Sequence, residues 1–173
     1  MKAHRRQPAR LAARAEKGLY RALLSLRTEA ECQQFLNDLA SGATAELYES
    51  FNNGATWTEI TGVQPSVFGF PVAAHPLEAD TAWFVPATKD MERIPKDAKV
   101  VVNRTKDACA TFQTFSKGLP QEHAYDIVYR HALALDETGK RLAIGSTTGG
   151  LWVSENGGDD WTEVVHTLPP VYA

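Results

Sequence analysis

The sequence predicts a mainly β protein in which repeated antiparallel hairpins follow a short helical segment. Two observations lead to this fold class. A turn-forming stretch rich in Asn and Gly occurs at 154–161 and again at 50–57, and apolar strand-like runs flank both copies. The composition, 43% hydrophobic and 23% charged over 173 residues, is that of a soluble globular chain able to bury a sizeable core.

The repeated stretch has the spacing Ser-x-Asx-x-Gly-x-x-Trp. Its Ser and Asx side chains can hydrogen-bond their own turn, the glycine permits a tight bend, and the tryptophan can cover the base of the hairpin. The first copy comprises Ser50, Asn52, Gly54 and Trp57, the last comprises Ser154, Asn156, Gly158 and Trp161, and a degenerate middle copy comprises Thr105, Asp107 and Phe112. Cys109 stands where this middle copy should have glycine. We expect each copy to brace a hairpin and the tryptophans to be buried.

This pattern resembles the Asp-box of the bacterial neuraminidase (BNR) repeat family, whose sialidase-like repeats form the blades of WD40/YVTN-like β-propellers. The resemblance covers about residues 46–173. It implies a partial β-propeller of about two four-stranded antiparallel blades plus a leading hairpin. In that family the box is structural and not catalytic, so the resemblance implies an architecture and leaves the activity open.

The N-terminal segment reads as helical. Apolar residues recur at three- and four-residue spacing between 8 and 40, and Thr28 with Glu31 has the form of a capping box. Residues 19–40 resemble the N-terminal helices of tryptophan-repressor-like regulators. The chain changes to strand patterns where that family continues into its helix-turn-helix, so DNA binding is not carried over. We therefore divide the chain into a helical segment, 1–42, and an incomplete propeller, 43–173.

Strand patterns fill the rest of the chain. A hairpin is expected at 46–60, and paired runs follow at 70–76 with 81–85 and at 126–133 with 141–145. These give two complete blades, 70–115 and 126–165, with an inserted loop at 88–97 in the first, of a kind that usually projects from a functional face. A closed propeller takes about 4 to 8 blades. The sequence thus predicts a fragment or fusion of a longer protein.

Composition narrows the cofactors, partners and location. Cys32 and Cys109 lack disulfide or zinc-ligand spacing, so neither a metal nor another cofactor is expected. A net charge of -3 makes nucleic acid an unlikely partner, although the first twenty residues are locally basic. The sequence has no signal-peptide core and no membrane span, which favours a cytoplasmic protein over one with a targeting presequence.

Four residues near strand ends are candidate ligand contacts: His75, Tyr129, Arg130 and His131. Superposing the two strand pairs aligns His75 with Arg130 or His131, so all four could face one central pocket. The arginine fork suits a carboxylate or phosphate, and histidine can titrate near neutral pH. The alternative is that neighbouring backbone groups satisfy these side chains.

The function predicted from these features is a non-catalytic binding or scaffold module. Its partners would be another protein or further propeller blades, with a carbohydrate or small anionic ligand also possible. One alternative is an exo-sialidase-like glycosidase remnant, because Glu122, Asp126, Tyr129 and Arg130 have suitable side chains. These residues are crowded into one predicted strand, so no catalytic residue is assigned. The second alternative is a DNA-associated regulator acting through the N-terminal helices.

Overall fold

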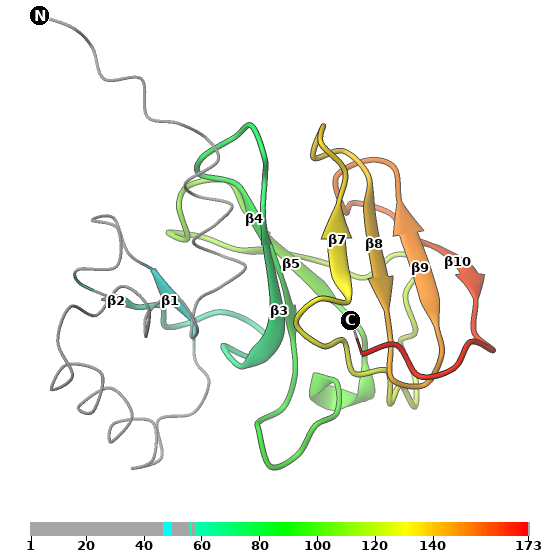
Figure 1. The fold of residues 1–173 in the computed structure, drawn as a ribbon. Helices are drawn as coiled ribbons and strands as arrows, with labels where there is room; N and C mark the ends of the chain where they lie inside the picture. Colours follow the sequence, from blue (N-terminus) through cyan, green and yellow to red (C-terminus); the bar gives the residue numbers. More distant parts are fainter. Residues whose placement is uncertain (1–46, 50–55, 57, 173) are drawn as a thin grey trace, which may run out of the picture.

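Two four-stranded antiparallel sheets form most of the fold (Figure 1). The computed structural model describes residues 47–49, 56 and 58–172. The strands of the first sheet are β3 (Gly69–Ala74), β4 (Ala82–Pro86), β5 (Val102–Thr105) and β6 (Gln113–Phe115). Those of the second sheet are β7 (Leu133–Leu135), β8 (Leu142–Gly145), β9 (Leu151–Ser154) and β10 (Thr162–Val165). Each sheet is a meander, since every strand pairs with its neighbours in sequence.

The remaining elements are short. A two-stranded hairpin, β1 (Tyr48–Glu49) and β2 (Thr58–Glu59), precedes the first sheet. A 3-10 turn, η1 (Lys96–Ala98), lies between β4 and β5 and overlaps the end of the inserted loop. Both four-stranded sheets lie where the sequence predicts blades. The helical prediction for 1–42 concerns residues outside the described ranges. Among the described residues, no helix is long and apolar enough to cross a membrane.

The inner strand of the second sheet lies later in the chain than expected. The prediction placed a strand at 126–133, but β7 comprises Leu133–Leu135 and residues 126–132 form the connection from the first sheet. The reason is a tight turn at Asp136. Its carboxylate accepts hydrogen bonds from the backbone N–H groups of Lys140 and Arg141, both at 3.2 Å, and from the Thr138 hydroxyl at 2.9 Å. The strand therefore ends directly before this turn.

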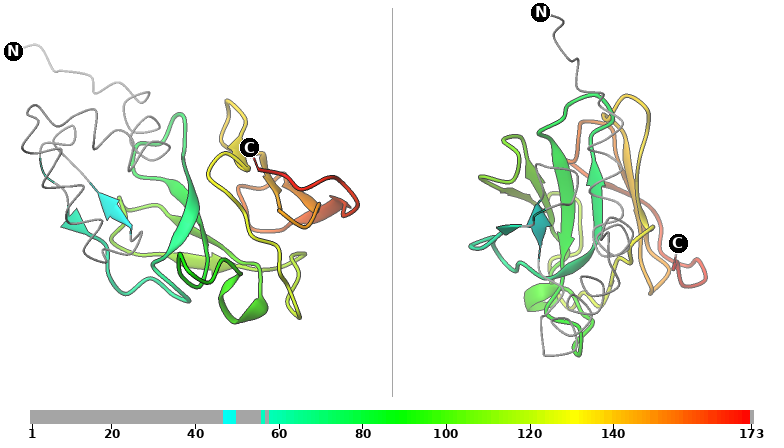
Figure 2. Two further views of the ribbon diagram at one scale, coloured as in Figure 1. Left: turned by 60° about the horizontal axis from the view of Figure 1, so that its bottom comes forward. Right: turned by 60° about the vertical axis from the view of Figure 1, so that its left-hand side comes forward.

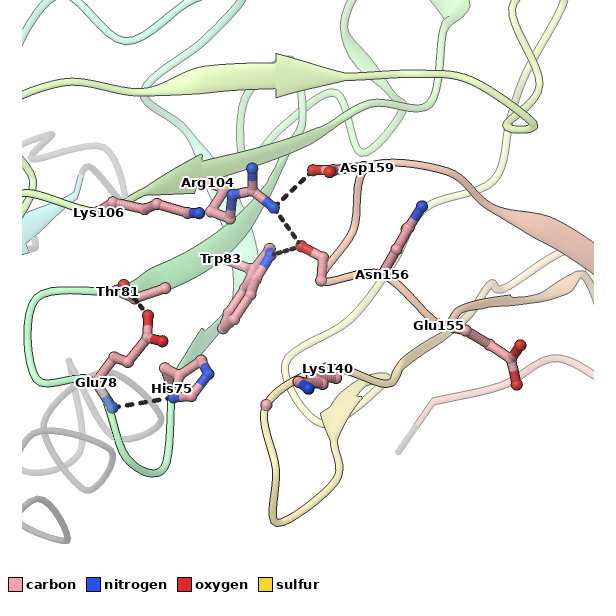
Figure 3. A pocket seen from close by; sticks show the side chains of 12 residues that line it. His75, Glu78, Thr81, Trp83, Arg104, Lys106, Lys140, Glu155, Asn156 and Asp159 are labelled. Atoms are coloured by element: carbon pink, nitrogen blue, oxygen red, sulfur yellow. Dashed lines mark hydrogen bonds and ion pairs between the residues drawn. The ribbon is translucent and has the colours of Figure 1, made fainter.

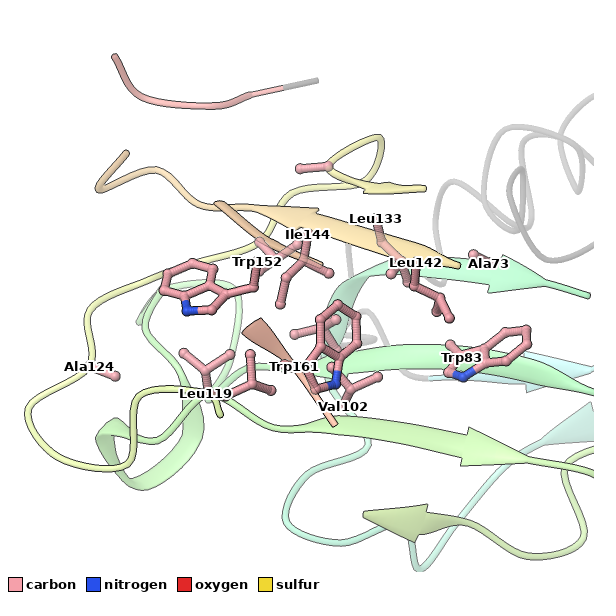
Figure 4. Close-up of a cluster of buried hydrophobic side chains, with 14 residues drawn as sticks. Ala73, Trp83, Val102, Leu119, Ala124, Leu133, Leu142, Ile144, Trp152 and Trp161 are labelled. Carbon is pink, nitrogen blue, oxygen red and sulfur yellow. The ribbon is translucent and has the colours of Figure 1, made fainter. Parts of the chain in front are cut away.

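The main hydrophobic core lies between the two sheets. Inner strands β3 and β7 are neighbours (Figures 1 and 2). Side chains from the two sheets meet between the sheets (Figure 4). Because side chains alternate along a strand, Leu142 and Ile144 of β8 both point into this core. Three tryptophans contribute its largest side chains: Trp83 and Trp152, each 2% exposed, and Trp161, 4% exposed.

The opposite face of the first sheet is also covered. Ile60 and Val63, which follow β2, pack with Phe84 of β4 in a second apolar cluster. The Asn103 side-chain amide donates to the Gln64 carbonyl at 2.8 Å, which ties the same segment to β5. Both faces of this sheet are therefore buried, which explains the nearly unbroken burial along β4 and β5.

Candidate functional site

The turn between β9 and β10, residues 154–161, is braced by its own side chains. The Ser154 hydroxyl accepts the Gly158 N–H at 2.9 Å and donates to Asn156 Oδ1 at 3.0 Å. The same Asn156 oxygen accepts the Asp160 N–H at 3.0 Å, and the Trp161 indole donates to the Gly158 carbonyl at 3.0 Å. Trp161 is 4% exposed, which confirms the prediction that it is buried.

The β5–β6 turn, residues 105–112, has the same hydrogen-bond pattern. The Thr105 hydroxyl donates to Asp107 Oδ1 at 2.9 Å and accepts the Cys109 N–H at 3.0 Å. Asp107 also accepts the backbone N–H of Thr111 at 2.8 Å and its hydroxyl at 2.6 Å. These bonds from Thr111, together with that from Thr105, lower the pKa of the Asp107 carboxyl. The counterpart residue in the β9–β10 turn, Asn156, does not titrate.

The first copy of the pattern lies outside this comparison. Its four residues, Ser50, Asn52, Gly54 and Trp57, fall outside the described ranges.

The β9–β10 turn also joins the two sheets. The Gly157 carbonyl accepts two hydrogen bonds, from the Trp83 indole and from Arg104 Nη1, both at 2.8 Å. Arg104 forms an ion pair with Asp159 at 2.7 Å, and its guanidinium lies 4.4 Å from the Phe115 ring centre. The Arg104 side chain is only 9% exposed, so its charge is nearly buried and is held by the second sheet (Figure 3).

A cleft of about 270 Å³ opens beside this contact, between the β3–β4, β7–β8 and β9–β10 turns (Figure 3). Its lining residues carry both signs of charge and are His75, Glu78, Thr81, Trp83, Arg104, Lys106, Gly139, Lys140, Glu155, Asn156, Gly157 and Asp159. Several of them already serve the structure. His75 Nδ1 accepts the backbone N–H groups of Leu77 and Glu78 at 3.1 and 3.0 Å, and its ring stacks on Trp83.

The structure separates the four predicted ligand contacts. His75 directly follows β3, whereas Tyr129, Arg130 and His131 precede β7, at the opposite end of the inner strands (Figure 1). The predicted alignment is wrong: the counterpart of His75 is Asp136. The two N–H groups make equivalent hairpin bonds, His75 to the Thr81 carbonyl and Asp136 to the Arg141 carbonyl. His75 thus braces a turn by accepting backbone N–H groups, as Asp136 does.

An aromatic surface lies at the end of the inner strands where Tyr129 is found. The Tyr129 ring centre is 5.0 Å from that of Phe70 and 6.0 Å from that of Tyr172, and the Arg93 guanidinium lies 5.6 Å from the Phe70 ring centre. We call these four residues the aromatic surface. The Tyr129 hydroxyl and the Asp90 carboxylate raise the pKa of Arg93. Tyr172 is 64% exposed, and Arg130 and His131 beside Tyr129 are also exposed.

Three members of this surface were not predicted from the sequence. Arg93 lies in the inserted loop, which the sequence marked as projecting but did not connect with Tyr129. Phe70 was assigned to a strand and Tyr172 was given no role. Phe70 alone carried a signal, an aromatic residue at the start of an inner strand, as Tyr129 shortly precedes the other inner strand.

Asp126, a candidate glycosidase carboxylate, is used structurally. It accepts hydrogen bonds from the hydroxyls of Ser146, at 2.9 Å, and Thr148. These bonds tie the connection between the sheets to the β8–β9 turn. Within the described ranges, no group of three or more His, Cys, Asp or Glu side chains could hold a metal ion.

Comparison with known proteins finds similar structures only. No protein-family model and no curated protein matches the chain. The GH74 xyloglucanase from Xanthomonas campestris is similar at 25% identity and a TM-score of 0.51, over 68% of this chain and 17% of that one. A GH74 enzyme from Niastella koreensis is similar at 21% identity and a TM-score of 0.44, over 58% of this chain and 15% of that one. The structure of YCF48 bound to D1 peptide is similar at 13% identity and a TM-score of 0.27, over 74% of this chain and 65% of that one.

The sheet topology and the match to the xyloglucanase support a propeller-like fold for the described region. The chain spans less than a fifth of the length of the two GH74 enzymes. The likeness therefore identifies the architecture and assigns no activity.

Proposed function

We propose that this chain is a non-catalytic binding or scaffold module built from Asp-box propeller blades of the BNR type. The supporting observation is that its candidate polar groups hold the fold together. Arg104 and Asp159 join the two sheets, Asp107 and Asn156 brace turns, and Asp126 fixes the connection between sheets. Groups already engaged in this way are poorly suited to act as general acids, bases or nucleophiles.

The aromatic surface is the proposed ligand contact. Tyr129 and Tyr172 offer flat apolar rings with polar hydroxyls, and Arg93, whose Nη2 is paired with the Asp90 carboxylate at 3.0 Å, adds a positive charge that can attract an anion. Arg130 and His131, both exposed and adjacent to Tyr129 in the sequence, are further donors for an anion. A small anionic ligand, such as a carboxylate-bearing sugar, fits this combination.

Titration with anionic sugars and simple carboxylates, followed by chemical-shift mapping, tests the proposal. We expect perturbations at Tyr129, Tyr172 and Arg93, and their loss in Arg93→Gln. Arg141→Gln is the matched control, since Arg141 is exposed at the start of β8. Perturbations confined to 154–161, or none at any residue, would contradict this ligand surface.

A glycoside hydrolase remnant is the second candidate, favoured by the likeness to the GH74 xyloglucanase. An assay for turnover of chromogenic glycosides distinguishes a hydrolase from the non-catalytic binding or scaffold module. We expect no hydrolysis above background from the intact chain. Hydrolysis that Asp126→Asn abolishes would favour the enzyme.

A further inference from the structure

One ring nitrogen of the buried His75 carries a donor that the rest of the described chain does not use. The other nitrogen, Nδ1, accepts the backbone N–H groups of Leu77 and Glu78, so the ring proton lies on Nε2. His75 is 7% exposed, and Nε2 has no hydrogen-bond partner within the part of the chain that the structure describes. Buried polar side chains normally have such a partner, so this donor indicates a place for a ligand.

The Nε2 edge of this ring faces the cleft beside the β3–β4, β7–β8 and β9–β10 turns. A Cβ on Gly139 would lie 2.1, 2.4 and 2.5 Å from Nε2, Cδ2 and Cε1 of His75. Because these three distances are so similar, Gly139 lies over the face of the ring and not in line with the N–H. Trp83 stacks on the same ring, with 5.7 Å between the ring centres. The ring orientation is therefore fixed, with Nε2 turned away from Glu78 and toward the β7–β8 turn (Figure 3).

The charged residues that line the cleft leave two ammonium groups without a partner. Arg104 and Asp159 neutralise each other through their ion pair. Glu155 turns its carboxylate away from the other labelled side chains (Figure 3). Lys106 and Lys140 are exposed, and neither forms an ion pair with a described residue.

Glu78 is the remaining carboxylate of the lining. Its Oε2 accepts the Thr81 hydroxyl at 3.1 Å. Two ammonium groups against this one carboxylate give an excess of one positive charge, which matches a monoanion. The cleft volume of about 270 Å³ is just below the usual range of ligand sites, which begins at about 300 Å³. The ligand is therefore a small molecule or a single side chain.

We infer that this cleft is a second binding site, separate from the aromatic surface, and that its ligand is a small carboxylate. One carboxylate oxygen accepts the N–H of His75 Nε2, and the ammonium groups of Lys106 and Lys140 balance its charge. Hydrogen bonds to a charged acceptor are stronger than those between neutral groups, which favours a carboxylate over a neutral acceptor. His75 and Lys106 belong to the first sheet and Lys140 to the second, so a bound carboxylate connects the two sheets.

Titration of the full chain with sodium acetate at constant ionic strength, followed by chemical-shift mapping, tests this site. We expect the largest shifts at the backbone N–H groups of Leu77 and Glu78, because both bind the other nitrogen of the His75 ring. Shifts are also expected at Gly139 and Lys140. An end-blocked tripeptide with one glutamate distinguishes a free carboxylate from an acidic side chain, and the tighter of the two identifies the source.

Four variants separate the proposed contacts. His75→Asn keeps an acceptor for the turn but lacks the Nε2 donor, and should weaken acetate binding at least about tenfold. Lys140→Gln should weaken it about two- to fivefold, as expected for an exposed charge. Glu78→Gln should strengthen it by removing a like charge. Lys99→Gln is the matched control, because Lys99 is exposed and does not line the cleft.

Circular dichroism establishes that each variant is folded, and the exposed Lys140 keeps the test decisive even if His75→Asn is unstable. Absence of shifts at Leu77 and Glu78 up to about 100 mM acetate, a hundredfold above a millimolar dissociation constant, would overturn the inference. So would binding that Lys140→Gln leaves unchanged or that Lys99→Gln weakens equally. Arg93→Gln, in the aromatic surface, should not alter these shifts, so failure of one site is distinguishable from failure of the other.

Discussion

The β5–β6 and β9–β10 turns share one hydrogen-bond pattern but differ in the residues at positive φ. Ala108 and Cys109 have φ of 54° and 68°, whereas Gly157 and Gly158 have 74° and 92°. The turn conformation alone therefore does not require glycine. A Cβ on Gly158 would lie 3.0 Å from the Trp83 indole nitrogen, so it is the close packing against the first sheet that favours glycine at this position.

Among the substitutions that compare the two turns, replacing the tryptophan of the β9–β10 turn should lower the free energy of unfolding the most. Trp161→Ala removes a buried ring and its bond to the Gly158 carbonyl, and should lower the free energy of unfolding by about 3 to 5 kcal/mol. The counterpart Phe112 is only partly buried, so Phe112→Ala should cost clearly less. Urea denaturation measures both. Equal losses would show that the two turns contribute alike to the core.

The next largest loss of stability is expected at the second positive-φ residue of each turn, Gly158 or Cys109. Gly158→Val places a branched residue at φ of 92° and against Trp83, which should cost about 1 to 3 kcal/mol. Cys109→Val, at a position that already holds a side chain, should cost less. The difference in urea midpoints reports the crowding between sheets, and its absence would refute that explanation.

The first positive-φ position allows a reciprocal exchange. Gly157→Ala should destabilise the fold by about 1 kcal/mol, since its Cβ meets no atom closer than 3.4 Å and the cost is conformational. Ala108→Gly should stabilise it by about 0.5 to 1 kcal/mol, the relief of strain exceeding the added freedom of the unfolded chain. Thermal unfolding followed by circular dichroism gives both signs. Shifts in the same direction would contradict the equivalence of the two turns.

Replacing the Asp107 carboxylate of the β5–β6 turn should change the stability at neutral pH the least of these substitutions. The pKa of Asp107 is lowered in the folded chain, so its contribution to stability is present above its unfolded pKa and is lost as pH falls below about 4. Asp107→Asn, which copies Asn156, should have nearly wild-type stability at pH 7 and lose less stability on acidification. Urea midpoints of the wild type and of Asp107→Asn, measured between pH 7 and pH values below about 4, test this expectation. A parallel acid dependence in both proteins would exclude Asp107 as the source.

The features that could be predicted from the sequence are those that depend on residues close together in the chain, namely the strands and the turns. Alternating apolar runs and turn residues located both sheets, and the recurring spacing identified Ser154 and Thr105 as equivalent. The expected alignment of His75 with Arg130 or His131 is wrong because His75 and Asp136 brace corresponding turns with different chemical groups, so residue type concealed their equivalence. Contacts between segments far apart in sequence, such as Arg93 with Phe70 or Arg104 with Gly157, left no periodic pattern to detect.

The carbonyl shared by Trp83 and Arg104 also bears on the order of assembly. Every strand pairing within the four-stranded sheets joins neighbours in sequence, whereas Gly157 lies 74 residues from Trp83 and 53 from Arg104. Loop-closure entropy favours the local pairings first, so the meanders form before the contact between them. An opening in which the sheets part while each remains paired would expose the main core, so its free energy should approach that of global unfolding. Hydrogen exchange at the indole of Trp83 reports that opening directly.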